Sequence, residues 1–327
     1  MAERVRAAGI DCGTNSIRLL IADVDPAAGR LRDVTRLMEI VRLGQDVDRT
    51  GRFAPDSLER TLGAVARFGQ LCRQERVGSL RFVATSATRD AANRNVFLDG
   101  VRAELGVEPE VIDGLEEARL SFAGALTALP SGLEQPYLCV DLGGGSTELV
   151  LGSAEPDFAY SMDVGCVRVT ERYLRSDPPT GDEVAAAIRA VDAVLDAAAG
   201  HVPLGQAATL IGLAGSITTI TAHALGLTRY QPERIDGAVL TVGQVLRSCE
   251  ELWQAARQER ARMGFMHPGR ADVIGAGALV WSRVVQRVRL EVEANGGALE
   301  HVVTSEHDIL DGIALSAARH PRRCFSL

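Results

Sequence analysis

Residues 140–151 read Val140-Asp141-Leu142-Gly143-Gly144-Gly145-Ser146-Thr147-Glu148-Leu149-Val150-Leu151. An apolar run ends in an aspartate, three glycines turn the chain, and a second apolar run follows. This order predicts a strand, a tight turn and a second strand. Glycine adopts positive φ at no steric cost and lets bare backbone N–H groups approach a ligand. A turn of this kind makes a concave site that suits an anion such as phosphate.

Two carboxylates flank this turn. Asp141 precedes the glycines and Glu148 follows them, and both would repel a bare phosphate. A hard divalent cation such as Mg²⁺, held between the carboxylates and the phosphate oxygens, resolves that conflict. A β-hairpin with a glycine-rich turn and no ligand also fits this stretch when it is taken alone.

The same pattern occurs a second time near the N-terminus. Residues 8–22 are again an apolar run, an Asp-x-Gly turn with small polar residues, and a second apolar run. Asp11 and Asp141 lie 141 − 11 = 130 positions apart. Two phosphate-type turns at this spacing indicate a duplicated domain whose copies face each other across a cleft. The repeat therefore favours phosphate binding over an ordinary hairpin.

Hydrophobic periodicity and turn residues predict the remaining elements. Strands are expected at residues 5–11, 16–24, 31–41, 80–84, 110–112, 136–142, 146–152, 157–164, 207–213 and 302–305. Helices are expected at residues 55–74, 85–106, 117–130, 180–200, 241–264 and 270–288, with two more beginning near residues 215 and 309. A strand meander followed by helices thus occurs in both halves of the chain.

The composition excludes several classes of protein. The 327 residues are 46 % apolar, which is enough for the cores of two domains. A net charge of −8 argues against a broad nucleic-acid-binding surface. All 35 basic residues are arginine, which excludes Walker-type phosphate binding, lysine Schiff bases and pyridoxal-phosphate catalysis.

The chain also shows no sign of membrane insertion or secretion. No apolar run approaches the length of a membrane span, and the first residues do not form a signal peptide. The cysteines have no paired spacing, which indicates reduced thiols and a cytoplasmic protein; they are Cys12, Cys72, Cys139, Cys166, Cys249 and Cys324.

The two turns also carry a family resemblance. Asp11–Ser16 and Asp141–Glu148 resemble the two phosphate motifs of the exopolyphosphatase / guanosine pentaphosphate phosphohydrolase family, which belongs to the superfamily of actin, sugar kinases and heat-shock chaperones. Further stretches match in the family's order along nearly the whole chain: Ala84–Ala91, Asp113–Leu120, Val164–Arg168, Gly212–Thr219 and Arg270–Ile274.

The resemblance implies an α/β fold of two actin-like (ribonuclease H-like) domains. Each domain would have a mixed sheet flanked by helices, and the active site would lie in the interdomain cleft. We expect the first domain at residues 1–124, braced by a C-terminal helix at about 307–320, and the second domain at residues 125–306. The chain lacks the long C-terminal helical extension of many relatives, so we expect weak processivity on long polyphosphate.

The site residues follow from the same resemblance. Asp113 and Glu116 fit a capping box, so Glu116 has a structural explanation. On spacing alone Glu117 would be a surface acid, and only the match to the family's Glu-Glu-Ala motif makes it the general base. Asp141, Glu148 and Asp11 are expected to hold Mg²⁺ (or Mn²⁺), with Glu148 also catalytic. The expected phosphate-binding residues are Gly13, Thr14, Asn15, Ser16, Gly143, Gly144, Gly145, Ser146, Gly215, Ser216 and Arg89.

Some polar residues have a plain structural alternative. Gly215 fits close helix–sheet packing as well as an anion site at a helix N-terminus. Arg94 fits a solvated helix face. Arg257, Arg260 and Arg262 are expected to be exposed, either lining a polyphosphate track or, more commonly, simply solvated beside Glu259.

The most consistent function is a metal-dependent hydrolase that releases terminal orthophosphate from inorganic polyphosphate, preferring short to medium chains. Guanosine pentaphosphate is the alternative substrate, and guanosine tetraphosphate a further candidate ligand. An ATP-dependent small-molecule kinase and a non-catalytic alarmone sensor remain as rivals. We expect a homodimer that binds neither nucleic acid nor membrane.

Overall fold

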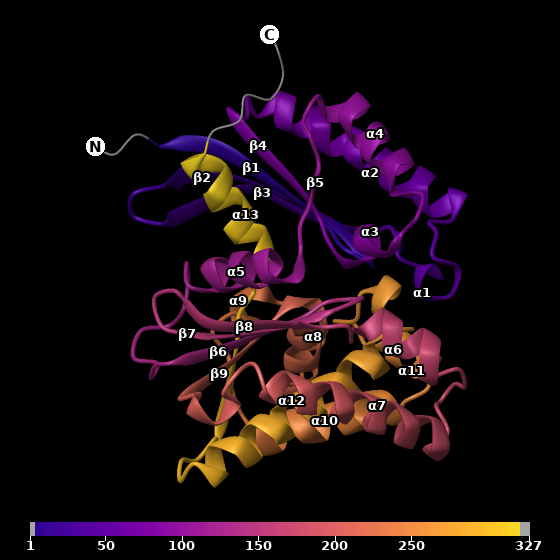
Figure 1. Cartoon of the computed structure of the whole chain (residues 1–327), viewed down its shortest axis with the longest axis vertical. Coiled ribbons are helices and arrows are strands. Elements are labelled where there is room, and N and C mark those ends of the chain that lie inside the picture. Colours follow the sequence, from indigo (N-terminus) through magenta and orange to yellow (C-terminus); the bar gives the residue numbers. More distant parts are fainter. Residues whose placement is uncertain (1–3, 321–327) are drawn as a thin grey trace. The chain divides into compact units, whose positions relative to one another are not determined.

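The computed structural model describes residues 4–320, so the first three residues and Cys324 lie outside the described part. The chain divides into two compact units (Figure 1). Unit 1 comprises the chain up to Thr127 together with the segment that starts at Asp308, and unit 2 comprises Ala128–His307. Within residues 4–320, every helix is too short or too polar to cross a lipid bilayer.

Unit 1 is built on a five-stranded mixed sheet in the order β3-β2-β1-β4-β5. The first three strands form an antiparallel meander, and the last two lie parallel to β1. The strands are β1 (Val5–Cys12), β2 (Ser16–Asp25), β3 (Arg30–Ile40), β4 (Ser79–Ala84) and β5 (Glu110–Val111). The Asp-x-Gly turn of this unit therefore joins β1 to β2.

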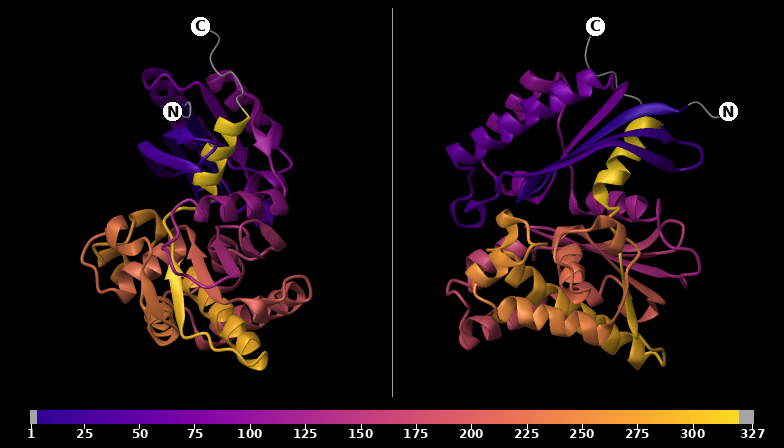
Figure 2. Two further views of the ribbon diagram at one scale, coloured as in Figure 1. Left: turned by 90° about the vertical axis from the view of Figure 1, so that its left-hand side faces the viewer. Right: turned by 180° about the vertical axis from the view of Figure 1, so that it is seen from behind.

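Both faces of this sheet are covered because apolar residues occupy both faces of β1 and β2. Ile10 and Leu19 face a core that includes Phe68, Phe82 and Phe97, under helices α2 (Pro55–Gln74) and α4 (Arg94–Leu105). Ala7 and Leu20 face the C-terminal helix α13 (Ile309–Arg319). Figure 2 shows α13 lying along the strands on the face opposite α2 and α4. Short helices α1 (Val47–Thr50) and α3 (Ser86–Asp90) and helix α5 (Gly114–Ala125) complete the unit.

Unit 2 repeats this plan with a six-stranded sheet in the order β10-β11-β9-β6-β7-β8. A three-stranded antiparallel meander is again followed by parallel strands, and an antiparallel strand closes the edge. The strands are β6 (Tyr137–Leu142), β7 (Thr147–Gly152), β8 (Pro156–Met162), β9 (Thr209–Leu213), β10 (Val239–Thr241) and β11 (His301–Thr304).

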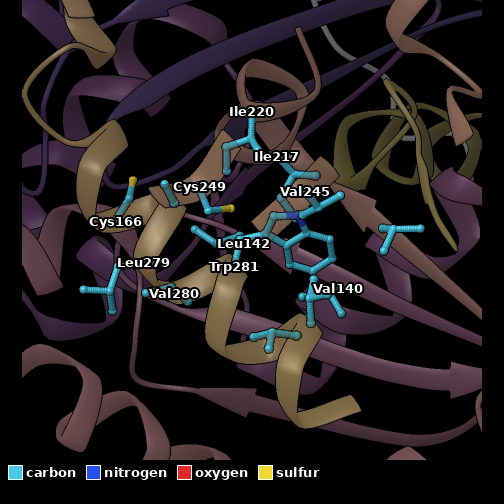
Figure 3. Close-up of a cluster of buried hydrophobic side chains, with 14 of the residues drawn as sticks. Val140, Leu142, Cys166, Ile217, Ile220, Val245, Cys249, Leu279, Val280 and Trp281 are labelled. Atoms are coloured by element: carbon cyan, nitrogen blue, oxygen red, sulfur yellow. The ribbon is translucent and has the colours of Figure 1, made fainter. Parts of the chain in front are cut away.

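The core of unit 2 lies between this sheet and its helices. Trp281 is fully buried at its centre, with Val140 and Leu142 from β6 and Ile217 beside it (Figure 3). Gly212 makes room for the indole, since a Cβ there would lie 2.9 Å from Trp281 Cζ2. The helical segments are α6 (Cys166–Tyr173), α7 (Gly181–Ala199), η1 (Leu204–Gln206), α8 (Ala214–Ala224), α9 (Pro232–Ile235), α10 (Val242–Gln254), α11 (Arg257–Arg262), η2 (Pro268–Arg270) and α12 (Ile274–Ala294).

The expected helix at residues 85–106 is two helices, α3 and α4. The chain is extended at Ala91, and the Asn93 side chain accepts a hydrogen bond from Phe53 N at 2.8 Å and donates one to Phe53 O at 3.1 Å. Because the Asn93 amide pairs with a distant backbone segment, the helix is interrupted there.

The expected helix at residues 241–264 is likewise two helices, α10 and α11. Ala255 and Ala256 are extended, and the Glu259 carboxylate accepts a hydrogen bond from Ala256 N at 2.8 Å, which starts the second helix. The expected exposure of Arg260 is wrong: Arg260 is only 6 % exposed, although Arg257 and Arg262 are exposed. The helix expected at 270–288 begins later and ends later, at Ile274 and Ala294.

Candidate active site

The turn of unit 1 is closed by a single short backbone bond. Gly13 N donates to Ser16 O at 3.0 Å, and Gly44 N donates to Thr14 O at 2.8 Å. Neither Thr14 nor Asn15 donates its amide N–H to a described residue. The buried hydroxyl of Thr14 also has no hydrogen-bond partner among the described residues. Buried polar groups are nearly always paired, so unpaired donors at this turn indicate a ligand site.

The turn of unit 2 has the same internal bond, from Gly143 N to Ser146 O at 3.0 Å. Its carbonyl groups are held by the start of α6: Cys166 N donates to Gly143 O, and Arg168 Nε donates to Gly145 O at 2.9 Å. The amides of Gly144 and Gly145 donate to no described residue. Both turns therefore leave backbone amides that donate to no described residue, an arrangement that suits an anion.

Asp141 and Glu148 lie directly opposite each other on β6 and β7. Both side chains are buried, and Glu148 Oε1 accepts a hydrogen bond from Ser161 Oγ at 2.7 Å. Within residues 4–320, no three His, Cys, Asp or Glu side chains gather closely enough to hold a metal ion by themselves. Mg²⁺ is commonly bound by one or two carboxylates together with substrate phosphates and water. Two paired carboxylates beside an anion-binding turn fit that mode of binding.

Glu117 lies in the first turn of α5, and only 8 % of its surface is exposed. Arg89 Nη1 donates to Glu117 Oε2 at 2.7 Å and also to Ile112 O at 2.9 Å. Burial raises the pKa of Glu117 to about 7, Arg89 opposes the rise, Asp11 adds to it, and a hydrogen bond with Thr85 opposes it. Such a carboxylate suits a general base at neutral pH.

Thr85 connects this glutamate to the turn of unit 1. Its hydroxyl is a hydrogen-bond partner of Glu117 and would lie 3.9 Å from a Cβ placed on Gly13. Thr85 N donates to Cys12 O at 3.2 Å. The Thr85 side chain therefore lies between Glu117 and Gly13. The candidate base is thus at the edge of the phosphate-type turn.

The neighbouring Glu116 has a different role. Asp113 caps the helix by accepting a hydrogen bond from Glu116 N at 2.8 Å. The Glu116 carboxylate bonds to Arg81 Nη2 at 3.0 Å, so only the Asp113 half of the expected capping box is present. The reason is that Arg81 offers this carboxylate a charged partner, which makes a stronger hydrogen bond than a backbone amide.

Arg89 is a residue that the sequence predicts to bind phosphate. In the structure it donates a hydrogen bond to the Glu117 carboxylate. Both of its protein contacts use Nη1, and its Nε and Nη2 groups donate to no described residue. The guanidinium can therefore bind Glu117 through one nitrogen and a phosphoryl oxygen through the others.

Helix α8 begins at Ala214 directly after β9, one residue before the expected start, and Gly215 and Ser216 lie in its first turn. The structure adds two residues to which the sequence assigns no role. Ala214 adopts φ +68°, a strained conformation for a residue with a Cβ. The guanidinium of Arg270 lies on Gly215, where a Cβ would be only 1.4 Å from Nη1. Arg270 thus places a positive charge at this helix N-terminus, and its membership of a matching stretch is the only sequence signal for it.

An aromatic side chain also lies beside α8. Tyr230 Oη is 2.7 Å from Thr218 Oγ1, the fifth residue of the helix, and 2.5 Å from Glu306 Oε1. The sequence gives no sign of an aromatic residue beside a phosphate turn. Tyr230 and Thr218 are separated by 12 positions in the chain, and no local pattern indicates that they are in contact.

The expected site residues thus fall into one set in each unit. Asp11, Arg89, Glu117 and the turn at residues 13–16 belong to unit 1. Asp141, Glu148, the turn at residues 143–146, Gly215 and Ser216 belong to unit 2. A duplicated α/β unit with a phosphate-type turn after its first strand defines the two-domain actin-like fold, which structures of this class share.

The chain belongs to the Ppx/GppA phosphatase family, whose model matches residues 20–307. It is 50 % identical over 320 residues to Exopolyphosphatase 2 of Mycobacterium tuberculosis, covering 96 % of this chain and 98 % of that protein.

Solved structures agree with this assignment. An exopolyphosphatase-like protein superposes with a TM-score of 0.94 at 46 % identity, covering 97 % of this chain and 98 % of that one. The Ppx/GppA family member of Aquifex aeolicus gives a TM-score of 0.76 at 30 % identity, with 96 % and 97 % covered.

Proposed function

We propose that this protein is an exopolyphosphatase, a hydrolase that releases orthophosphate from the end of inorganic polyphosphate. The observation that carries the proposal is the buried Glu117, with a pKa of about 7 at the edge of a phosphate-type turn. It stands in a chain that is 50 % identical to an exopolyphosphatase over nearly its whole length.

Hydrolysis of a phosphoanhydride requires in-line attack by an activated water on the terminal phosphorus. Glu117 accepts a proton from that water as the new P–O bond forms. The bond between the terminal phosphorus and the bridging oxygen breaks, and that oxygen becomes the anionic end of the shortened chain. A base with a pKa near the working pH combines a useful ionised fraction with sufficient basicity.

The chain supplies the remaining requirements through fixed donors. The free amides of Thr14, Asn15, Gly144 and Gly145 would donate to phosphoryl oxygens without any reorganisation. The free nitrogens of Arg89 would bind the terminal phosphoryl group next to Glu117. These groups position the phosphoryl group for attack and offset its negative charge, so the overall charge of −8 does not prevent binding of a polyanion.

Asp141 and Glu148 would hold Mg²⁺ or Mn²⁺, with Asp11 as a further carboxylate. When bound, the cation neutralises charge on the transferred phosphoryl group. The two acids face each other across adjacent strands, and without a cation they would repel the substrate.

Phosphate release should therefore require a divalent metal. Treatment with EDTA should abolish release, and Mg²⁺ or Mn²⁺ should restore it. Asp141→Asn should raise the Mg²⁺ concentration for half-maximal activity about tenfold or more, whereas Asp157→Asn, at an exposed acid on β8, should leave it unchanged. Activity that persists after exhaustive chelation would remove the metal from the mechanism.

The substrate range follows from the same reasoning. We expect short to medium polyphosphate chains to be preferred, with lesser or no turnover of guanosine pentaphosphate. Tyr230 beside α8 favours a nucleotide, since an aromatic ring can stack on a base.

The test is a side-by-side measurement of kcat/KM for short polyphosphate, long polyphosphate and guanosine pentaphosphate. A preference of more than about tenfold for the nucleotide, equivalent to about 1.4 kcal/mol in transition-state binding, would reassign the substrate. Phosphate release without any acceptor separates the hydrolase from its two rivals. A kinase or a non-catalytic alarmone sensor should release essentially none.

A further inference from the structure

Asp11 is held by a side chain from the neighbouring strand. Asp11 on β1 and Arg18 on β2 are directly paired across the antiparallel ladder. Arg18 donates to Asp11 Oδ2 through Nε at 2.9 Å and through Nη2 at 2.7 Å. Asp11 Oδ1 accepts no hydrogen bond from any described residue. Arg18 therefore fixes one oxygen of this carboxylate and leaves the other for a ligand.

Arg18 is itself held from its far side by Asp308. Its Nη1 donates to Asp308 Oδ2. The other oxygen of Asp308 caps α13 by accepting a hydrogen bond from Leu310 N at 3.0 Å. Asp308 is only 3 % exposed, and both of its carboxylate oxygens accept hydrogen bonds within the fold.

The helix that carries Asp308 has little freedom to shift. A Cβ on Gly124 in α5 would lie 1.7 Å from Asp308 O, and a Cβ on Gly312 in α13 would lie 2.0 Å from Leu120 O. The backbones of α5 and α13 are thus in direct contact at both glycines. Asp308 is therefore held rigidly in place. Because Arg18 donates hydrogen bonds to both Asp308 and Asp11, it fixes the position of the Asp11 carboxylate relative to Asp308.

We propose that Arg18 and Asp308 are positioning residues that hold the Asp11 carboxylate by Oδ2, so that Oδ1 would be available to a divalent cation. This inference rests on the proposed function, in which Asp11 is one of the carboxylates that serve the metal. Residues that orient metal-binding side chains commonly change metal affinity or activity by about 10- to 100-fold when they are replaced.

A purely structural alternative is that these ion pairs only fasten α13 to the sheet. The same helix turn contains a matched comparison for that role. Asp311 is fully buried, completes the capping box by accepting a hydrogen bond from Asp308 N at 3.1 Å, and pairs with Arg36 at 2.5 and 3.1 Å. Asp311 therefore fastens α13 through its pair with Arg36.

The experiment compares Asp308→Asn with Asp311→Asn in the full-length protein. Asparagine remains a good N-cap at position 308, and at position 311 it keeps the size of the buried aspartate, so both variants should fold and show a similar decrease in unfolding temperature. Asp308→Asn should lower kcat for polyphosphate and weaken Mn²⁺ binding about tenfold or more, with KM nearly unchanged. The Mn²⁺ affinity is measured by electron paramagnetic resonance in the presence of orthophosphate. Asp311→Asn should leave kcat and Mn²⁺ affinity as in the wild type.

Arg18→Lys provides the second test if Asp308→Asn folds poorly. An ammonium group cannot bridge two carboxylates as the planar guanidinium does, so Arg18→Lys should show the same loss of kcat and Mn²⁺ affinity. Equal kcat and Mn²⁺ affinity in all variants, with a wild type that binds Mn²⁺, would overturn the positioning role alone. A wild type that hydrolyses polyphosphate without binding Mn²⁺ would overturn the metal role and this inference with it.

Discussion

Glu117→Gln should lower kcat for polyphosphate hydrolysis by about 10²-fold or more, with substrate binding largely intact, because a general base is lost. Glutamine keeps the shape of the side chain and can still accept a hydrogen bond from Arg89, which now lies 2.7 Å from Glu117 Oε2. It cannot take a proton from water. Single-turnover phosphate release and equilibrium binding of the substrate together measure the two effects.

The same variant should not lose stability. The pKa of Glu117 rises from 4.5 to about 7 in the folded protein, so stability is greatest when this carboxyl is protonated and falls as the pH rises from 4.5 through 7. Glutamine mimics the protonated form. Above pH 7 the variant should therefore be more stable than the wild type by up to about 3 kcal/mol, since one pKa unit corresponds to about 1.4 kcal/mol. Urea unfolding at pH 6 and pH 8 should show a difference that widens with pH.

Glu116→Gln is the matched control for this prediction. Glu116 bonds to Arg81 at 3.0 Å and is partly exposed, so its loss should cost about 1 kcal/mol or less and should change kcat by no more than about twofold. A comparable loss of kcat in both variants would show that the wrong member of the Glu116–Glu117 pair has been assigned as the base.

The fold is predictable from the sequence because its determinants are local. The apolar run, Asp-x-Gly turn and second apolar run specify a strand pair in each unit, and the repeat predicts two related sheets. The two turns close with the same backbone bond, Gly13 to Ser16 and Gly143 to Ser146. The strand pairs and the closing bonds of their turns are both determined by glycines and strand patterns that lie close together in the sequence.

The errors and omissions come from contacts between residues far apart in the chain. Asn93 interrupts a helix because it binds the backbone of Phe53, 40 positions away. Arg260 is buried because its guanidinium contacts Gly275 and lies 3.7 Å from Asp177. The strain at Ala214 and the stacking of Arg270 on Gly215 likewise depend on tertiary packing. No local pattern encodes these contacts.

The environment of Glu117 is the clearest case. The sequence alone favours a surface acid at this position, and only the family motif indicates a base. In the structure, burial and three partners from two other segments set its properties: Asp11 from β1, and Thr85 and Arg89 from α3 and its N-cap. A motif can therefore indicate which glutamate reacts, whereas the reason for its basicity becomes visible only in three dimensions.

Arg89 offers the second large effect, because it lowers the pKa of Glu117 through both its charge and its hydrogen bond. Arg89→Gln removes the charge, so the pKa of Glu117 should rise further. Since the base must be ionised to act, the acid limb of the pH profile of kcat/KM should move to higher pH by about one unit or more. At pH 7 this shift and the loss of a phosphate-binding cation should together lower kcat/KM about 10²-fold.

The pH profile distinguishes the two roles of Arg89. If Arg89 only binds phosphate, Arg89→Gln should raise KM at every pH and leave the acid limb where it is in the wild type. If it also controls Glu117, part of the lost activity should return at pH 9, where even a more basic Glu117 is ionised. Arg94→Gln removes the same charge five positions away at an exposed site and should change neither KM nor the pH profile. A shift of the acid limb in Arg94→Gln as large as that in Arg89→Gln would show that long-range charge, not the 2.7 Å contact between Arg89 and Glu117, controls the base.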